Sequence, residues 1–293
     1  MAMVAGGGGA GNVATRAKDV WRLVDMLRAS QRVTVLTGAG ISTDSGIPDY
    51  RSPGRPPYRP LQHHEFMNSE YTRKRYWARS LVGYPRLSQA RPNAAHKALV
   101  EFEQTGKLAH IITQNVDCLH QRAGSNSVLN LHGNIHEVVC LKCGHVSCRV
   151  AYQDLLLHHN PHMRGALSTD HGTSAARPDG DVELGEDAYA SFNLVHCGHD
   201  QGWMKPHVVF FGDNLEQEVV QQSYQAVDDG DMLLVAGTSL QVWSALRLVR
   251  RAISDGKPVA VVTRGPTRAD DIVTLKLDVP LADTLPSILQ DAA

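Results

Sequence analysis

A glycine-rich segment near the N-terminus has the residue types of a phosphate-binding loop. It reads Gly38-Ala39-Gly40, and the hydroxyl side chains of Ser42 and Thr43 follow it. Glycine lets a backbone approach a pyrophosphate closely, and the N-terminus of a following helix offers free N–H groups. The full dinucleotide fingerprint is absent, because Thr43 stands where a third glycine is expected and no acidic residue ends a clear second strand. By itself the loop leaves two interpretations open, a phosphate site or a plain tight turn.

The same segment continues through Ile47, Asp49, Tyr50 and Arg51. A charged pair and an aromatic side chain beside proline and glycine suggest a mobile flap that closes over a ligand. The alternative is an ordinary surface loop.

A second group of chemically capable residues is Cys140-x-x-Cys143, which has the spacing of half a tetrahedral zinc site. The chain has five cysteines in all. An odd number with one close pair does not resemble a secreted disulfide framework, so a reduced compartment with metal-bound or buried thiols fits better.

Length, composition and charge narrow the class of protein. The 293 residues suffice for one large domain or for a domain with a small module. A net charge of −1 gives no reason to expect a nucleic-acid or acidic-membrane partner. No apolar run approaches the length of a membrane span. Residues 1–11 lack the apolar core of a secretory signal, which leaves a transit peptide or a disordered tail.

Apolar periodicity predicts strands that alternate with helices. An amphipathic helix is expected over Thr15 to Ser30. Strands are expected at Val33–Thr37, Leu108–Thr113, Val128–Leu131, His207–Phe211, Met232–Ala236, Val259–Thr263 and Val273–Leu277, with helices at Glu216–Val227 and Val242–Ser254. This alternation predicts an α/β fold with a Rossmann-like parallel sheet and helices on both faces. Ligands of such sheets bind at the carboxyl ends of the strands.

Further motifs follow in order along the chain. They are Thr113-Gln114-Asn115-Val116-Asp117, Leu131-His132-Gly133, the segment from Lys205-Pro206 to Gly212-Asp213, Gly237-Thr238-Ser239-Leu240, and the segment from Gly265 to Asp271. Together with the glycine-rich loop, they strongly resemble the sirtuin family over about residues 30 to 280. Tyr50 and the run Tyr76-Trp-Ala-Arg79 are similar to the branch that contains the mitochondrial lipoamidase and ADP-ribosyltransferase sirtuin of animals and related bacterial proteins.

The resemblance implies an NAD-dependent protein lysine deacylase. Such an enzyme consumes NAD and transfers the acyl group of a lysine, which yields nicotinamide, free lysine and O-acyl-ADP-ribose. His132 would be the general base for a proton relayed from a ribose hydroxyl, a task that suits its near-neutral unperturbed pKa. Asn115 near the ribose and Asp117 on the nicotinamide amide would hold the reacting geometry.

The resemblance also implies which residues bind NAD and the substrate. The NAD contacts would be Gly38, Ala39, Gly40, Ser42, Thr43, Ile47, Asp49, Tyr50, Arg51, Gln114, Asn115, Val116, Asp117, Gly237, Thr238, Ser239, Thr263, Arg264, Gly265 and Leu281. An extended run would pair with the substrate peptide as an added strand, unless it is a simple core strand. This run is Val208, Val209, Phe210, Phe211 and Gly212.

Tyr76 and Arg79 are spaced to share one helix face. In sirtuins that remove acidic acyl groups, the same pair binds a carboxylate, to which an arginine fork donates two hydrogen bonds. We expect a preference for acyl groups larger than acetyl, including carboxylated ones. The alternative is a solvated basic helix face.

The metal half-sites depart from the family pattern. The family has a second Cys-x-x-Cys, but this chain reads Cys197-Gly-His199-Asp200, so the expected fourth cysteine falls on Asp200. Aspartate can ligate zinc, although His199 or His196 would be the better ligand chemically. We expect one structural zinc ion with a mixed ligand set, against a metal-free module as the alternative. The expected ligands are Cys140, Cys143, Cys197 and Asp200.

These inferences imply an organisation and competing functions. We expect a disordered tail at 1–14, a Rossmann-like NAD-binding domain at 15–135 and 205–293 with a helical insertion at about 53–92, and a zinc-binding module at 136–204. We expect a monomer that acts on acylated protein lysines, in the mitochondrial matrix of a eukaryote or the cytoplasm of a bacterium. The alternatives are a mono-ADP-ribosyltransferase, a non-enzymatic NAD-binding regulator and a hydride-transferring dehydrogenase.

Overall fold

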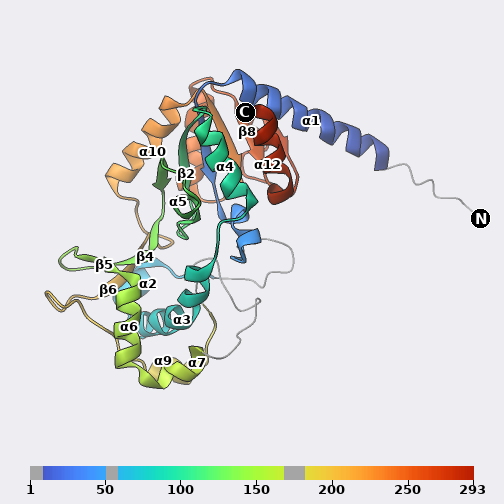
Figure 1. The fold of residues 1–293 in the computed structure, drawn as a ribbon. Coiled ribbons are helices and arrows are strands. Elements are labelled where there is room, and N and C mark those ends of the chain that lie inside the picture. The colour runs from blue at the N-terminus through green and yellow to red at the C-terminus, as the bar shows by residue number, and fades with distance from the viewer. Residues whose placement is uncertain (1–8, 51–58, 168–181) are drawn as a thin grey trace, which may run out of the picture.

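The structure is a computed structural model that describes residues 9–50, 59–167 and 182–293 (Figure 1). Arg51 lies outside the described residues. The elements are α1 (Gly9–Ala29), β1 (Val33–Thr37), η1 (Ala39–Ile41), η2 (Thr43–Ser45), α2 (His63–Asn68), α3 (Glu70–Gln89), α4 (Ala94–Gln104), β2 (Leu108–Thr113), α5 (Leu119–Ala123), β3 (Val128–Asn130), β4 (Gly133–Cys140), β5 (Val146–Cys148), α6 (Arg149–His159), η3 (Pro161–Met163), α7 (Arg164–Leu167), α9 (Glu186–Ala190), β6 (Met204–Val208), α10 (Gln217–Asp229), β7 (Met232–Ala236), α11 (Trp243–Ser254), β8 (Val259–Val262), β9 (Leu275–Leu277) and α12 (Leu281–Ala292).

Six parallel strands form the larger sheet, in the order β3-β2-β1-β7-β8-β9. Every residue of the central strands β1 and β7 is buried, as expected for strands that are covered on both faces. The chain moves outward from β1 to β3 in one direction and from β7 to β9 in the other. The strand order therefore reverses between β1 and β7, which is where ligands bind in open α/β sheets.

Helices cover the larger sheet on both faces, which confirms the predicted fold class. Apolar residues of α1, α4 and α12 pack on one face, and those of α10 and α11 pack on the other. Alternate residues of β1 contribute to the hydrophobic clusters on the two faces of the sheet. Val33 and Val35 belong to the cluster with α1, α4 and α12, and Leu36 belongs to the cluster with α10 and α11. Figure 1 shows α1, α4 and α12 gathered around the same end of the molecule.

A smaller unit lies below the large sheet in Figure 1. Its antiparallel sheet has the order β5-β4-β6, and its core joins side chains of α3 to those of α6 and of residues 182–204. The helices that follow the glycine-rich loop and the segment around the cysteines therefore share one hydrophobic core. Residues far apart in the sequence form this unit together.

The expected strand at His207–Phe211 was wrong in both bounds and partner. The observed strand is β6, Met204–Val208, and it pairs antiparallel with β4 in the smaller sheet. Sequence reasoning missed β4, whose buried and partly buried residues do not alternate regularly. Without β4 as a visible partner, the apolar end of β6 was assigned to the parallel sheet.

Helix α1 begins at Gly9, within the segment that we expected to be a tail. The amphipathic pattern indicated only the part that packs on the sheet, where Leu23, Val24 and Leu27 are fully buried. A formed helix extends at low cost, because each added residue contributes one hydrogen bond. Within the described ranges, none of the helices combines the length and apolar character of a membrane span.

Candidate functional site

Two glycine-containing loops interlock where the strand order reverses. Gly38 follows β1 and Gly237 follows β7, and the Gly40 N–H donates to the Gly237 carbonyl at 2.8 Å. A Cβ atom on Gly40 would lie 2.8 Å from that carbonyl oxygen, and Gly237 has a φ of +67°. Only glycine accommodates this approach and this backbone conformation. These two interlocked loops, the glycine cradle, lie at the carboxyl ends of β1 and β7, which is where a ligand binds in a sheet of this kind.

A chain of hydrogen bonds joins four of the predicted site residues. The Asn115 amide donates to the Gly38 carbonyl at 3.2 Å and to Ser42 Oγ at 3.0 Å. Ser42 in turn donates to Asp117 Oδ2 at 2.7 Å. The loops after β1 and β2 are thus held against each other by side chains that sequence reasoning assigned to NAD.

Asp117 is nearly fully buried, with 4% of its surface exposed. Burial raises the pKa of its carboxyl, and the hydrogen bonds from the Leu119 N–H and from Ser42 oppose that rise. Its Oδ1 accepts from Leu119 N at 2.9 Å, while Oδ2 faces Ser42. A buried carboxylate held in this way has the fixed acceptor geometry that recognition of an amide requires.

His132 lies between β3 and β4 and reaches toward the same strand ends. Its Nδ1 lies 3.0 Å from the Gln114 carbonyl oxygen. A carbonyl can only accept, so Nδ1 carries the proton and Nε2 carries the lone pair. Burial lowers the His132 pKa below its ordinary value; the bond to Gln114 opposes this, and the charge of Arg247 adds to it. The ring is therefore neutral near pH 7 and can accept a proton at Nε2.

The remaining strand-end residues line the same region. Gln114 donates to Thr238 Oγ1 at 3.0 Å, which joins the loop after β2 to the loop after β7. Leu281 begins α12, and its Cδ2 would lie 3.1 Å from a Cβ on Gly237. After β8, Thr263 is buried and Arg264 is exposed. The Gly265 N–H donates to Asp278 Oδ1 at 3.1 Å.

The expected flap connects the two units of the molecule. Ile47 is buried and packs in one cluster with Val208 of β6. The Tyr50 ring meets the Phe211 ring edge to face, with centroids 6.3 Å apart. Ala39, Asp49 and Val116 are partly buried beside these contacts, and Thr43 is exposed.

The run that we expected to pair with a peptide is a strand only at its first residue, Val208. Beyond it, the Val209 N–H donates to the His132 carbonyl at 2.9 Å, which sets this run beside the base. The Phe211 carbonyl accepts from His63 N at 2.8 Å, and Gly212 turns the chain with a φ of +77°. The residues after Val208 therefore lie outside β6, and pairing of this run with a substrate peptide stays a prediction.

Tyr76 and Arg79 do share a face of α3, but that face is buried. Arg79 has 8% of its surface exposed, so the alternative of a solvated basic face is excluded. Its Nε donates to the Val182 carbonyl at 2.9 Å, and its Nη2 lies 3.1 Å from Glu183 Oε2. The Tyr76 ring packs edge to face on Phe210 at 5.4 Å between centroids, within the expected substrate run.

The four expected zinc ligands come together in the smaller unit. Their ligand atoms all lie within 4.8 Å of one another, and they belong to Cys140, Cys143, Cys197 and Asp200. The Cys143 and Cys197 sulfurs are 3.8 Å apart, which matches the roughly 3.8 Å edge of a tetrahedron with Zn–S bonds of about 2.3 Å. This donor set therefore fits a zinc ion.

The two histidines that we considered as fourth ligands take part in other contacts. The His199 ring packs on that of His145, with centroids 4.2 Å apart. The His196 Nδ1 faces the Gln201 carbonyl at 3.1 Å. Asp200 thus completes the cluster in this structure, at the position where the sequence register placed it.

Several polar residues near the site were not predicted. Asn93 caps α4 and also donates to the Ile41 carbonyl at 2.8 Å. An asparagine directly before a helix is a recognisable N-cap signal. His120 Nε2 lies 2.9 Å from Thr37 Oγ1, and its ring lies 4.9 Å from that of buried His96. No local pattern distinguishes such histidines.

Ser244 is a further residue that sequence reasoning missed. Its Oγ lies 2.9 Å from His132 Nε2, although 112 positions separate the two residues. Nothing in the local sequence around Ser244 indicates this contact.

Comparison with known proteins agrees with this geometry. The Sir2 family matches residues 38–244. The NAD-dependent protein deacylase SIR4 of Monosiga brevicollis is 50% identical over 260 residues, which cover 88% of this chain and 84% of that protein. The NAD-dependent protein lipoamidase sirtuin-4, mitochondrial, of Homo sapiens is 42% identical over 278 residues, covering 93% of this chain and 86% of that protein.

Solved structures give the same result. A structure of Sir2 with a p53 peptide and NAD+ matches with a TM-score of 0.71 at 28% identity, covering 92% of this chain and 97% of that one. The ordered motifs, the strand-end site and these matches lead to one assignment. The chain belongs to the Sir2 family.

Proposed function

We propose that this chain is an NAD-dependent protein lysine deacylase, which releases nicotinamide, free lysine and O-acyl-ADP-ribose. The observation that carries this proposal is the position of His132, whose Nδ1 faces the Gln114 carbonyl and leaves the lone pair to Nε2, beside the glycine cradle where the strand order reverses. Relatives with up to 93% of this chain covered are named NAD-dependent protein deacylase, deacetylase or lipoamidase.

Each part of the site has a defined task in this reaction. The interlocked loops at Gly40 and Gly237 admit the pyrophosphate of NAD. Asn115 and Asp117 orient the nicotinamide ribose and the nicotinamide amide. His132 then accepts the proton of a ribose hydroxyl, which makes that oxygen nucleophilic toward the acyl carbon.

The acylated lysine would approach between the two units of the molecule. The run from Val209 to Phe211 borders His132 on one side and packs against Tyr76 on the other. Structures of Sir2 with a p53 peptide or a propionylated peptide match this chain. We propose acylated proteins as the substrate, and zinc in the four-ligand cluster as a structural ion.

We propose that the cellular location follows the source of the chain. Human and bovine relatives are named mitochondrial, which favours the mitochondrial matrix in a eukaryote. Matches to proteins of Mycobacterium avium and Pseudomonas syringae favour the cytoplasm in a bacterium.

The test uses purified protein, NAD and peptides that carry acetyl, succinyl, glutaryl, hydroxymethylglutaryl or lipoyl lysine. Mass spectrometry follows free lysine peptide, nicotinamide and O-acyl-ADP-ribose. We expect NAD-dependent deacylation that falls by about 10²- to 10⁴-fold in His132→Ala. A protein whose mass rises by one ADP-ribose would favour the mono-ADP-ribosyltransferase. Bound NAD without nicotinamide release on any peptide would contradict the proposal.

A further inference from the structure

The lone pair on Nε2 of His132, the proposed base, already accepts a hydrogen bond in this structure. His132 Nδ1 carries the proton, because it faces the Gln114 carbonyl. The lone pair at Nε2 faces Ser244 Oγ at 2.9 Å, so the Ser244 hydroxyl donates to it. A ribose hydroxyl cannot donate to the same lone pair while Ser244 does. Its proton must reach His132 either through Ser244 or after Ser244 has moved away.

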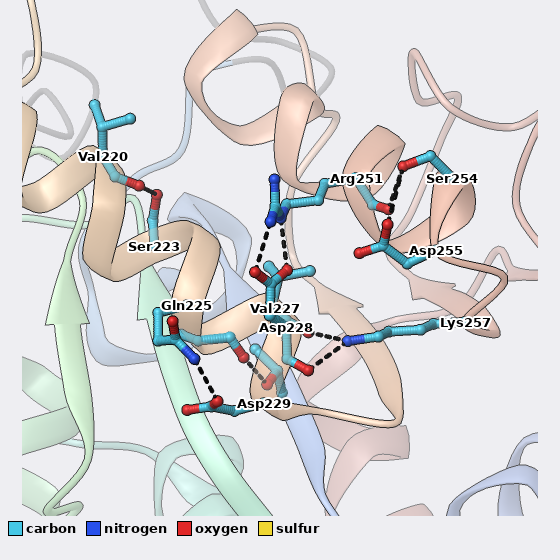
Figure 2. A network of polar contacts seen from close by, with 12 residues as sticks. Val220, Ser223, Gln225, Val227, Asp228, Asp229, Arg251, Ser254, Asp255 and Lys257 are labelled. Carbon is cyan, nitrogen blue, oxygen red and sulfur yellow. Dashed lines mark hydrogen bonds and ion pairs between the residues drawn. The ribbon is translucent and has the colours of Figure 1, made fainter.

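Contacts at the far end of α11 hold that helix in place. Arg251 makes two bonds of 2.6 Å to the Asp228 carboxylate of α10 (Figure 2). Lys257 donates to the Val227 and Asp228 carbonyls at 2.7 and 2.6 Å. Two parallel hydrogen bonds between a guanidinium and a carboxylate add geometric specificity as well as energy. Because α11 is anchored to α10, the Ser244 hydroxyl in its first turn has a defined position.

Arg247 lies about one turn after Ser244 on α11, and its positive charge acts on His132. Its guanidinium carbon lies 5.2 Å from the centre of the Tyr224 ring. Its Nε and Nη2 are buried, and no hydrogen-bond partner for them is found among the described residues. The charge of Arg247 favours the neutral form of His132. Burial and this charge both favour the return of the proton from a protonated His132.

We propose that Ser244 relays the ribose proton to His132, an inference that rests on the proposed function. The O–H bond of the ribose hydroxyl breaks, and its proton passes to Ser244 Oγ. The original Ser244 proton passes at the same time to His132 Nε2, which becomes part of a cationic imidazolium. The ribose oxygen keeps the electron pair and forms a bond to the acyl carbon, whose oxygen has already replaced nicotinamide on the ribose. The π pair of the C=N bond between that carbon and the lysine nitrogen moves to the nitrogen. Charge and atoms balance, and no further reactant is needed.

The relay predicts a split between two activities of the same active site. Nicotinamide leaves and returns by cleavage and re-formation of its bond to the ribose, without removal of a ribose hydroxyl proton. Exchange of labelled nicotinamide into NAD therefore requires the acyl peptide and the NAD site but not the relay. Deacylation requires all three. The ratio of the two rates isolates the proton transfer from NAD binding and from overall folding.

The experiment measures both rates for the wild type, Ser244→Ala, Ser244→Thr and Ser254→Ala. We expect Ser244→Ala to lose deacylation by about 10- to 100-fold and to keep nicotinamide exchange within about twofold. Ser244→Thr keeps a hydroxyl and retains most of the deacylation rate. Ser254→Ala makes the same chemical change at the other end of α11, where the Ser254 hydroxyl bonds to the Arg251 carbonyl of its own helix and to the neighbouring Asp255. It leaves both rates unchanged. Thermal melts confirm that all variants are folded.

A double-variant cycle separates the relay from a structural role. If Ser244 acts through His132, adding Ser244→Ala to His132→Ala changes deacylation by less than about twofold. A parallel loss of both activities in Ser244→Ala would overturn the relay, because it would indicate damage to the NAD site. Undiminished or faster deacylation in Ser244→Ala would also overturn it, because the ribose hydroxyl would then reach Nε2 directly. Absence of nicotinamide release from the wild type would overturn the proposed function and the relay with it.

Discussion

The strand-end site and the zinc cluster are built on different physical principles. At the strand ends, backbone contacts between glycines and buried hydrogen bonds hold the residues, and Asp117 Oδ1 and Oδ2 each accept one. In the cluster, three sulfurs and one carboxylate oxygen converge, and Cys143 is exposed. Once the thiols are deprotonated, as zinc ligands are, their charges and that of Asp200 repel one another unless a cation lies between them.

The difference implies that the two regions fail in different ways. The strand-end site is ordered by packing, so steric changes should damage it. The cluster depends on its ion, so chelation and ligand exchange should damage it while leaving the larger sheet intact. Four predictions test that contrast, in order of decreasing effect.

Substitution of a cradle glycine should have the largest effect. In Gly40→Ala, the new Cβ would lie 2.8 Å from the Gly237 oxygen and 2.9 Å from the Gly237 Cα. We expect a loss of about 1–3 kcal/mol in the free energy of unfolding and a weakening of NAD binding by tenfold or more. Urea unfolding and calorimetric titration with NAD measure the two effects.

Gly198→Ala, in the smaller unit, is the matched control, because no atom of the described residues lies within 4 Å of the added Cβ. It should leave the free energy of unfolding within about 0.5 kcal/mol of the wild type. Equal effects of the two substitutions would show that the cradle is not the sterically tighter region.

Acid should weaken the strand-end region through two buried histidines. Burial lowers the pKa of His96 to about 4 and that of His120 to about 3. In the unfolded chain the two histidines take up protons as the pH falls through about 6.5, whereas in the folded chain they stay neutral to a much lower pH. The free energy of unfolding therefore keeps its full contribution from these two residues above about pH 6.5, and it decreases as the pH falls below that value. Between pH 7 and pH 5.5, protonation of these two histidines in the unfolded chain should lower the free energy of unfolding by about 2.5 kcal/mol.

Urea unfolding at several pH values measures this effect. In His120→Gln, the slope of stability against pH should be smaller than in the wild type by about one proton. An unchanged slope in the variant would show that His120 is protonated in the folded protein.

The carboxylate ligand Asp200 should make zinc binding by the cluster weaker than binding by four cysteines. We expect a chelator to remove zinc from the wild type about tenfold faster than from Asp200→Cys, because thiolate is a softer and tighter zinc ligand than carboxylate. A zinc-sensitive dye follows the release, and melting curves report the loss of stability. His199→Ala is the control, since His199 lies outside the cluster and stacks on His145. Purified protein without zinc, with a melting curve that chelators do not change, would refute the site.

The smallest expected effect is on the preference for one acyl group over another. Arg79 already meets a carboxylate of its own chain, Glu183. Arg79→Met should weaken removal of carboxylated acyl groups more than removal of acetyl. Glu183→Gln should raise the succinyl-to-acetyl ratio of kcat/KM by about two- to fivefold, because a partly exposed ion pair contributes up to about 1 kcal/mol. Equal changes for both acyl groups would show that Arg79 does not contact the acyl chain.

Local sequence was sufficient for the parts of the molecule whose signal is local. Apolar runs such as Val33–Thr37 and Met232–Ala236 predicted the buried strands correctly, because strands covered on both faces must be apolar throughout. The ordered motifs gave the family, and the register of Cys197 pointed to Asp200. Each of these inferences depends on residues close together in the chain.

Contacts between distant segments were decided only by the tertiary structure. β6 joined the antiparallel sheet because β4 pairs with it, and β4 has no regular alternation to predict it. Ser244 meets His132 across 112 positions, and Arg79 meets Glu183 across 104. Periodicity reports which face of an element is buried, but not which element covers it. The hydroxyl partner of His132 and the carboxylate partner of Arg79 therefore become visible only in the folded chain.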